Sequence, residues 1–324
     1  MTQPLLLAPA EGLIVYKDIR ISLRSRFFCW MFKLILRPLL GRAIRGSDER
    51  IAKMQLLTTS MKCPNTHGLA LEYTVVGQVP GHVFGDLRDT GKPVLLYLHG
   101  GAFLLPAAPT AQLELVASLA AKLGAHAFVP DYRLAPRNHF PFALDDCERS
   151  YRVLLDLGFT ADRIVIAGES AGGNLILGVL QRIRKQGWPM PSCVVPISPA
   201  TEMGRIHAPP SRPMLRKVDA ILPIAALQRV DEMYAGNWDA SDPELSPLYA
   251  DCTGFPPMLI IATDAEVLLD DSTLFARRAK AAGVDVRCEI WPRLPHAFPL
   301  FGALFSEVKQ VKIDMLEFMR KHLK

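Results

Sequence analysis

From about residue 68 onward, short apolar runs alternate with longer segments of mixed polarity. The apolar runs have the length of strands and occupy residues 71–77, 94–98, 127–130, 164–168, 193–197, 258–263 and 286–291. Between and after them, apolar residues recur three and four positions apart, which predicts helices over 110–124, 142–158, 174–187, 272–283 and 307–323. This alternation predicts an α/β fold with a mostly parallel sheet, whose strands are apolar throughout because both faces are covered.

Two regions depart from the alternation. The segment from about Pro199 to Pro257 is rich in proline and charge and contains no clear strand, so we interpret it as an insertion that lies over the sheet. The first sixty residues precede the alternation. Neither region changes the fold class, but both are available to cover the sheet.

The composition excludes several classes of protein. Half of the 324 residues are hydrophobic, which is enough for one large domain or two ordinary ones. The net charge of +5 is spread along the chain, so nucleic acid is not an expected partner. The six cysteines lack the spacing of a zinc site or a disulfide framework, and a reducing, cytoplasmic location is expected. No metal motif, phosphate loop or dinucleotide motif occurs, so no cofactor is expected.

The region around residues 20–45 is both apolar and basic. It is interrupted by Lys33, Arg37 and Pro38, and it falls short of the roughly 20 apolar residues that span a bilayer. The start of the chain has no basic stretch before its apolar residues, so a secretory signal is not expected. Two interpretations stay open: a helix that covers the rest of the protein, or a membrane-peripheral helix that also contacts anionic lipid.

A G-x-S-x-G motif lies between a predicted strand and a predicted helix. Its serine is Ser170, flanked by Gly168 and Gly172. A sharp strand-to-helix turn lifts the serine hydroxyl above the sheet edge, and crowding two residues to either side requires glycine. The N-terminus of the helix also stabilises negative charge that develops there. The setting therefore predicts that Ser170 is a nucleophile.

The stretch HGGAF, residues 99–103, directly follows another predicted strand. A serine that attacks a carbonyl group creates an oxyanion, which needs hydrogen-bond donors worth about 3 kcal/mol each. A glycine-rich loop supplies backbone N–H groups that approach the substrate closely. We therefore predict an oxyanion hole formed by Gly100, Gly101 and Ala102, together with the N–H group of Ala171, the residue after the nucleophile.

A general base is expected after the serine in the chain. His296 follows the predicted strand 286–291 in a loop marked by prolines, whereas His207 lies in the insertion and His322 on the last helix. His296 is therefore the predicted base.

The acid that orients the base is less clearly specified. Asp264 and Glu266 both follow the predicted strand 258–263, so the spacing leaves both open. Asp270 and Asp271 adjoin the next helix, and we interpret them as helix caps.

The order of the motifs resembles the hormone-sensitive-lipase-like esterases, bacterial family IV. These motifs are HGGAF, DYRLAP (131–136), GESAGGNL, SPL (246–248), PPMLIIATDAEVLLDD and PHAF. The resemblance covers roughly residues 68–324 and implies an α/β-hydrolase fold that acts on carboxylic esters. It implies a core formed by residues 63–199 and 246–324, with a helical cap formed by residues 1–62 and 200–245.

The acid motif of the family, D-P-L-R-D, falls without gaps on residues 266–270. The resemblance therefore implies that Glu266 is the acid, although glutamate stands where the family has aspartate. Asp264 remains the rival.

Two further positions depart from the family pattern. Ala102 stands where the family has glycine, which keeps the backbone donor but costs about 1 kcal/mol if the position needs a positive φ. Arg137 replaces a glutamate, and we have no interpretation of this change. In the family, the segment with Asp131 and Arg133 supports the loops around the site, so these two residues are expected to be structural.

The sequence therefore predicts a cofactor-free serine carboxylesterase that hydrolyses short- to medium-chain esters. Ser170, His296 and Glu266 would form the catalytic triad, and the reaction would pass through an acyl-enzyme. Two alternatives stay open: amide, carbamate or lactone hydrolysis by the same triad, and a small-molecule receptor without catalysis. The expected partner is a small-molecule ester, and the sequence leaves a monomer or a homodimer open.

Overall fold

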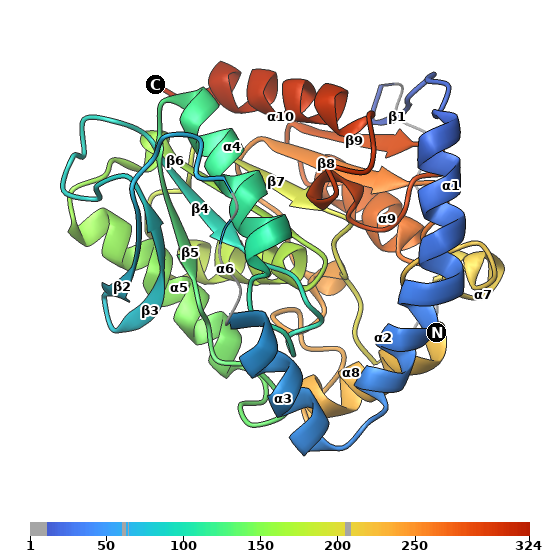
Figure 1. Cartoon of the computed structure of the whole chain (residues 1–324). Helices are drawn as coiled ribbons and strands as arrows, with labels where there is room; N and C mark the ends of the chain where they lie inside the picture. The colour runs from blue at the N-terminus through green and yellow to red at the C-terminus, as the bar shows by residue number, and fades with distance from the viewer. Residues whose placement is uncertain (1–11, 60–62, 64, 205–208) are drawn as a thin grey trace.

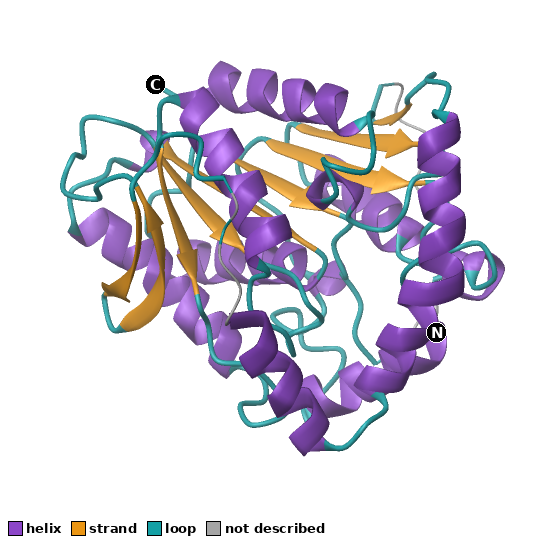
Figure 2. Cartoon of the chain, viewed as in Figure 1, coloured by secondary structure: helices purple, strands orange, loops and turns teal. Residues whose placement is uncertain are grey.

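The computed structural model describes residues 12–59, 63, 65–204 and 209–324. Its centre is a nine-stranded sheet in the order β1-β9-β8-β7-β6-β4-β5-β3-β2 (Figure 1, Figure 2). The strands are β1 Ile14–Tyr16, β2 Leu71–Val76, β3 Val79–Phe84, β4 Val94–Leu98, β5 His126–Pro130, β6 Ile164–Glu169, β7 Cys193–Ile197, β8 Met258–Thr263 and β9 Val286–Trp291.

Most of the sheet is parallel. Only the pairs β2–β3 and β3–β5 are antiparallel. Every residue of β4, β6, β7 and β8 is buried, because helices cover both faces of these strands. The predicted α/β class with a mostly parallel, two-sided sheet is confirmed.

Helices pack on both faces of the sheet (Figure 2). Within β4, Leu95 and Tyr97 join a core with α4 and α10, whereas Leu96 and Leu98 join the opposite core with α5, α6 and α9, as the two-residue period of a strand requires. The helices of the described residues are α1 Leu23–Met31, η1 Phe32–Leu36, α2 Arg37–Ile44, α3 Asp48–Thr59, η2 Pro109–Leu113, α4 Glu114–Leu123, α5 Phe142–Asp156, η3 Ala161–Arg163, α6 Ala171–Gln186, α7 Ser211–Leu215, α8 Ile224–Ala235, η4 Pro247–Tyr249, α9 Leu269–Ala281, η5 Phe298–Leu300 and α10 Val308–His322.

Two strands were not predicted. The segment 1–62 was expected to be helical, but Ile14–Tyr16 forms β1 and pairs in parallel with β9 at the edge of the sheet. The expectation was wrong there because a three-residue strand carries no detectable period. Strand β3 was missed because Pro80 and Gly81 interrupt it, and both residues are unfavourable inside strands.

The helices of the first sixty residues and those of the insertion meet beyond the carboxyl ends of the parallel strands. In Figure 1, α2, α3 and α8 lie together on this side. Arg229 of α8 pairs with Asp48 of α3 at 3.5 Å, and a Cβ atom at Gly41 would lie 3.3 Å from Pro223. No strand occurs between β7 and β8 in the described residues. We propose that these two segments form one cap.

Candidate active site

Ser170 sits at a tight turn between β6 and α6. Its backbone has φ 56° and ψ −115°, a strained conformation for a residue with a side chain. A Cβ atom at Gly172 would lie 1.8 Å from the carbonyl oxygen of Leu98, and one at Gly168 would lie 2.2 Å from the same oxygen. The two glycines are therefore required by close packing against the neighbouring strand, and this packing holds Ser170 at the end of the sheet.

His296 and Glu266 meet at the ends of neighbouring strands. The Nδ1 atom of His296 lies 2.6 Å from Oε2 of Glu266, and both side chains are buried. The second oxygen of Glu266, Oε1, accepts hydrogen bonds from Ser198 Oγ at 3.0 Å and from the N–H group of Thr263 at 2.9 Å. Because both carboxylate oxygens are engaged, the side chain is fixed in one orientation.

Asp264 lies elsewhere. Its Oδ1 atom accepts the N–H group of Arg293 at 2.6 Å, and the residue lines a surface pocket with Cys29 and Lys33. The fold therefore brings Glu266, and not Asp264, to the imidazole.

The surroundings of His296 act on its protonation in opposite directions. Burial disfavours the charged ring and lowers its pKa, but the hydrogen bond to Glu266 and the charge of that carboxylate raise it. The net effect is a pKa of His296 above its ordinary value of 6.5.

The loop that contains HGGAF is fixed by a buried carboxylate. Oε1 of Glu169 accepts the N–H group of Gly100 at 2.6 Å and Nε2 of Gln112 at 2.9 Å, while Tyr97 Oη donates to Oε2 at 2.7 Å. Gly100 was predicted to be an oxyanion donor. This prediction is corrected, because the N–H group of Gly100 already donates its hydrogen bond to Glu169. Burial raises the pKa of Glu169, although these hydrogen bonds oppose the rise.

Three predicted donors remain. Within the described part of the chain, the N–H groups of Gly101, Ala102 and Ala171 donate to no other protein group. Gly101 has φ 105° and Ala102 has φ 58°, so the alanine adopts the left-handed conformation in which glycine is more favourable. A cost of about 1 kcal/mol is expected at Ala102.

The segment DYRLAP packs beneath this loop. Tyr132 Oη donates to the carbonyl oxygen of His99 at 2.6 Å, and the two rings stack at 4.2 Å. Arg133 forms a two-pronged ion pair with Asp146 at 2.8 Å, which ties the segment to α5. Arg137 is exposed, and nothing in the structure explains its charge.

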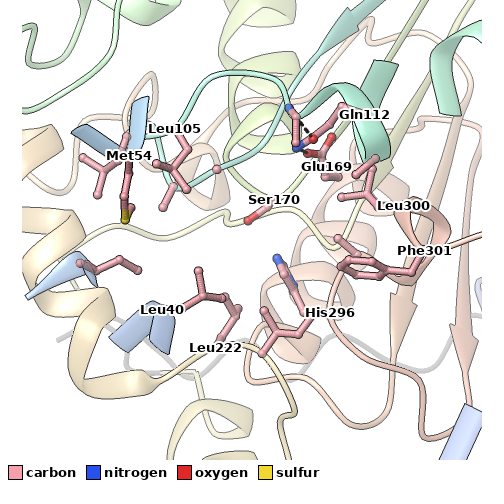
Figure 3. A pocket seen from close by; sticks show the side chains of 18 of the residues that line it. Leu40, Met54, Leu105, Gln112, Glu169, Ser170, Leu222, His296, Leu300 and Phe301 are labelled. Carbon is pink, nitrogen blue, oxygen red and sulfur yellow. Dashed lines mark hydrogen bonds between the residues drawn. The ribbon is translucent and has the colours of Figure 1, made fainter. Parts of the chain in front are cut away.

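Ser170 and His296 open into one apolar pocket of about 290 Å³. Figure 3 shows the ring of His296 directed toward the hydroxyl of Ser170, with leucine and methionine side chains around them. The cap contributes Leu40, Ile44, Ile51 and Met54 to the wall. Among the residues described, no group of three or more His, Cys, Asp or Glu side chains is placed to hold a metal ion.

Comparison with known proteins identifies the family. A family model described as the alpha/beta hydrolase fold matches residues 95–300. An acetyl-hydrolase of Streptomyces hygroscopicus is 34% identical over 236 residues, which are 73% of this chain and 78% of that protein. The crystal structure of a hormone-sensitive-lipase homologue from a metagenome library is 34% identical, with a TM-score of 0.80 over 93% of this chain and 99% of the other. The chain is a hormone-sensitive-lipase-like, family IV carboxylesterase.

The resemblance predicted from the motifs is thus confirmed, and so are the α/β-hydrolase fold and carboxylic ester hydrolysis. A further relative, the hormone-sensitive lipase of Bos taurus, is 33% identical over 189 residues, which are 57% of this esterase and 24% of that lipase.

Several supporting residues of the esterase were not predicted from its sequence, among them Ser198, Gln112 and Asp219. Asp219 Oδ2 accepts the N–H group of Val267, which fixes the residue directly after Glu266. Ser198 could have been suspected, since it follows a parallel strand and such strand ends converge on one edge. Gln112 and Asp219 gave no signal, because each acts through a partner far away in the chain.

Asp270 and Asp271 do not cap the helix, contrary to the sequence interpretation. The N-cap residue of α9 is Leu268, which makes no side-chain cap. Asp270 instead accepts the N–H group of Ser211 at 2.8 Å. Asp271 accepts two hydrogen bonds from Arg212, at 2.8 and 3.2 Å. The two carboxylates hold α7 of the insertion against the core.

Arg212 is expected to be important for the stability of this esterase. It is buried between the carboxylates of Asp271 and Glu202, at 2.8 and 3.2 Å. Arg212→Met should lower the free energy of unfolding by about 3–5 kcal/mol, because it leaves buried carboxylate charge without its counter-ion. Urea unfolding followed by circular dichroism measures this change. The exposed neighbour serves as the control: Arg216→Met should change stability by about 0.5 kcal/mol or less. Equal effects of the two substitutions would contradict the assignment.

Proposed function

We propose that this esterase hydrolyses short- to medium-chain carboxylic esters with Ser170 as nucleophile, His296 as general base and Glu266 as the orienting acid. One observation carries the proposal, the arrangement of His296 between its two neighbours. Its Nδ1 atom is hydrogen-bonded to Glu266, and its other nitrogen faces the strained Ser170 inside an apolar pocket. The hydrogen bond to Glu266 requires a proton on Nδ1, which leaves Nε2 free to accept one.

In the first half of the proposed reaction, Ser170 Oγ attacks the ester carbonyl carbon while His296 Nε2 takes the hydroxyl proton. The N–H groups of Gly101, Ala102 and Ala171 stabilise the oxyanion, and Glu266 stabilises the imidazolium. When the tetrahedral intermediate collapses, the bond between carbon and the alcohol oxygen breaks. His296 then gives its proton to that oxygen, and the alcohol leaves an acyl-enzyme on Ser170.

In the second half, a water molecule takes the place of the alcohol. His296 removes its proton as the water oxygen attacks the acyl carbon, and it then returns a proton to Ser170 Oγ as the carboxylic acid leaves. Protons move only between the substrate, water and the triad, so the proposed mechanism uses no cofactor.

The apolar lining of the pocket supports the proposed chain length. A panel of p-nitrophenyl esters should give the highest kcat/KM among the short- to medium-chain members, and lower values for long chains that exceed the pocket. The matched anilides, carbamates and lactones should react more slowly. Faster turnover of anilides would assign the enzyme to amide hydrolysis. Mass spectrometry after treatment with a fluorophosphonate should find the label on the peptide that contains Ser170.

The pH dependence follows from the state of His296. The base acts only when the ring is neutral, and its pKa lies above 6.5. We therefore expect kcat/KM to fall as the pH drops through a midpoint above 6.5 and to reach a plateau on the alkaline side. Since kcat/KM reports the free enzyme, a pH–rate profile with a p-nitrophenyl ester measures this midpoint. A midpoint below 6.5 would mean that burial outweighs Glu266.

A further inference from the structure

The outer side of α1, η1 and α2 exposes large apolar side chains. On α1 and η1 these side chains recur three or four positions apart, which places them on one face of the helix. Helix α2 contributes one further exposed apolar side chain. Each is 54% exposed or more. We call this set the outer apolar face: Leu23, Phe27, Trp30, Leu34, Ile35 and Leu39.

The fold does not need this face. The inner side of the same helices already packs on the core, where Phe32 contacts the rings of Phe301 and Phe305. Ser25 donates to Glu307 at 2.5 Å and ties α1 to the start of α10. A helix at a protein–water boundary normally presents polar residues outward. Here large apolar side chains lie on both sides of the helices, which indicates that the outer side is a binding surface for a protein or a membrane.

The charge around the face indicates what it meets. Residues 19–47 contain seven basic residues and no Asp or Glu. In the part of the chain that the structure describes, no carboxylate lies within 4 Å of any of their charged groups, and all except Arg37 are exposed. They are Arg20, Arg24, Arg26, Lys33, Arg37, Arg42 and Arg45. An apolar helix face with a surplus of Lys and Arg is typical of binding to an anionic lipid surface.

A second segment of the cap extends the same kind of surface. Met214 of α7 and Val218, three residues after the end of this helix, are 74% and 48% exposed. Arg216 and Lys217 stand between them and are exposed as well. Arg37 of α2 donates to the carbonyl oxygen of Arg216, so the two segments adjoin.

We propose that the outer apolar face and its basic residues dock the esterase on the surface of an anionic bilayer. No helix in the described residues combines the length and apolarity needed to cross a membrane, so the contact is with one surface. Leu40 and Ile44, on the same helix as Leu39, line the pocket of Ser170. Docking therefore places a wall of the pocket close to the lipid, where apolar esters partition.

Vesicle co-sedimentation of the full chain tests the proposal without substrate, so its result does not depend on the catalytic mechanism. Vesicles of phosphatidylcholine and phosphatidylserine should bind the protein, and phosphatidylcholine alone should bind it much more weakly. Binding to the anionic vesicles should fall at about 1 M NaCl, where the Debye length is about 3 Å. Equal binding to both vesicle types would overturn the anionic part of the proposal, and no binding to either would overturn all of it.

Two sets of substitutions localise the contact. Arg26→Gln, Lys33→Gln and Arg42→Gln together should weaken binding about 100-fold, since each basic residue near an anionic surface is worth about fivefold. The control set Lys185→Gln, Lys280→Gln and Lys321→Gln removes the same charge from exposed positions elsewhere and should lower binding much less.

The apolar set Phe27→Ser, Trp30→Ser and Leu34→Ser should also weaken binding by about 100-fold or more. Trp30→Phe should keep binding but lose part of the vesicle-induced change in tryptophan fluorescence. Circular dichroism and unchanged hydrolysis of a soluble ester show that each variant is folded. If light scattering showed instead that the apolar set converts a dimer into a monomer while vesicle binding is unchanged, the face would be an interface between two copies and the proposal would be wrong.

Discussion

Ser170→Ala is expected to lower kcat for a p-nitrophenyl ester by about 10⁴- to 10⁶-fold, with the fold intact. The substitution removes the oxygen that would form the proposed acyl-enzyme, while the N–H groups around the pocket and the apolar walls stay in place. Alanine keeps the same backbone cost at φ 56°, so the free energy of unfolding should change little. Steady-state kinetics together with urea unfolding measure both quantities.

The variant also discriminates between an enzyme and a receptor on the same fold. If the kcat of the wild type exceeds the kcat of the Ser170→Ala variant by the factor given above, catalysis by Ser170 is supported. Wild-type turnover equal to that of the variant would support the receptor alternative. If the Ser170→Ala variant kept an acceleration far above the roughly 10⁴-fold that the oxyanion hole and substrate binding can supply alone, a different group would attack the ester.

The sequence could predict the position of Ser170, the proposed nucleophile, because its signal is local. A strand, two glycines around one serine and a helix follow each other within about twenty residues, and the steric reason for the glycines applies within the turn itself. The position of His296 follows from the general geometry of a parallel sheet, whose strands end at one edge. The positions of Ser170 and His296 could therefore be predicted without knowing which distant segments contact each other.

The remaining details depend on contacts between distant segments. Asp264 and Glu266 are two residues apart in one loop, so spacing alone left both open. The family motif implied Glu266, and in the structure it is Glu266 that contacts His296. Gly100 looked like an oxyanion donor until Glu169, 69 residues away, was found to occupy its N–H group. Asp271 looked like a helix cap because its partner Arg212 is 59 residues away. Periodicity and local motifs contain no information about such pairs.

Glu266→Gln is expected to lower kcat by about 10⁴-fold, whereas Asp264→Asn should leave kcat within about twofold of the wild type. The reason lies in the two donors that hold the carboxylate, Ser198 Oγ and the N–H group of Thr263, which both point at Oε1. An amide at this position turns its oxygen toward these donors, so that its NH₂ group faces Nδ1 of His296. The ring must then accept at Nδ1 and carry its proton on Nε2.

A ring with its proton on Nε2 cannot take the proton of Ser170, although every atom remains in place. The loss should therefore appear in kcat, with KM and the free energy of unfolding nearly unchanged, which separates a wrong tautomer from a damaged fold. Ser198→Ala provides a graded comparison. It leaves the carboxylate but removes one of the two donors that orient it, so we expect a loss of about tenfold. If Asp264→Asn reduced kcat as severely as Glu266→Gln, the assignment of the acid to Glu266 would fail.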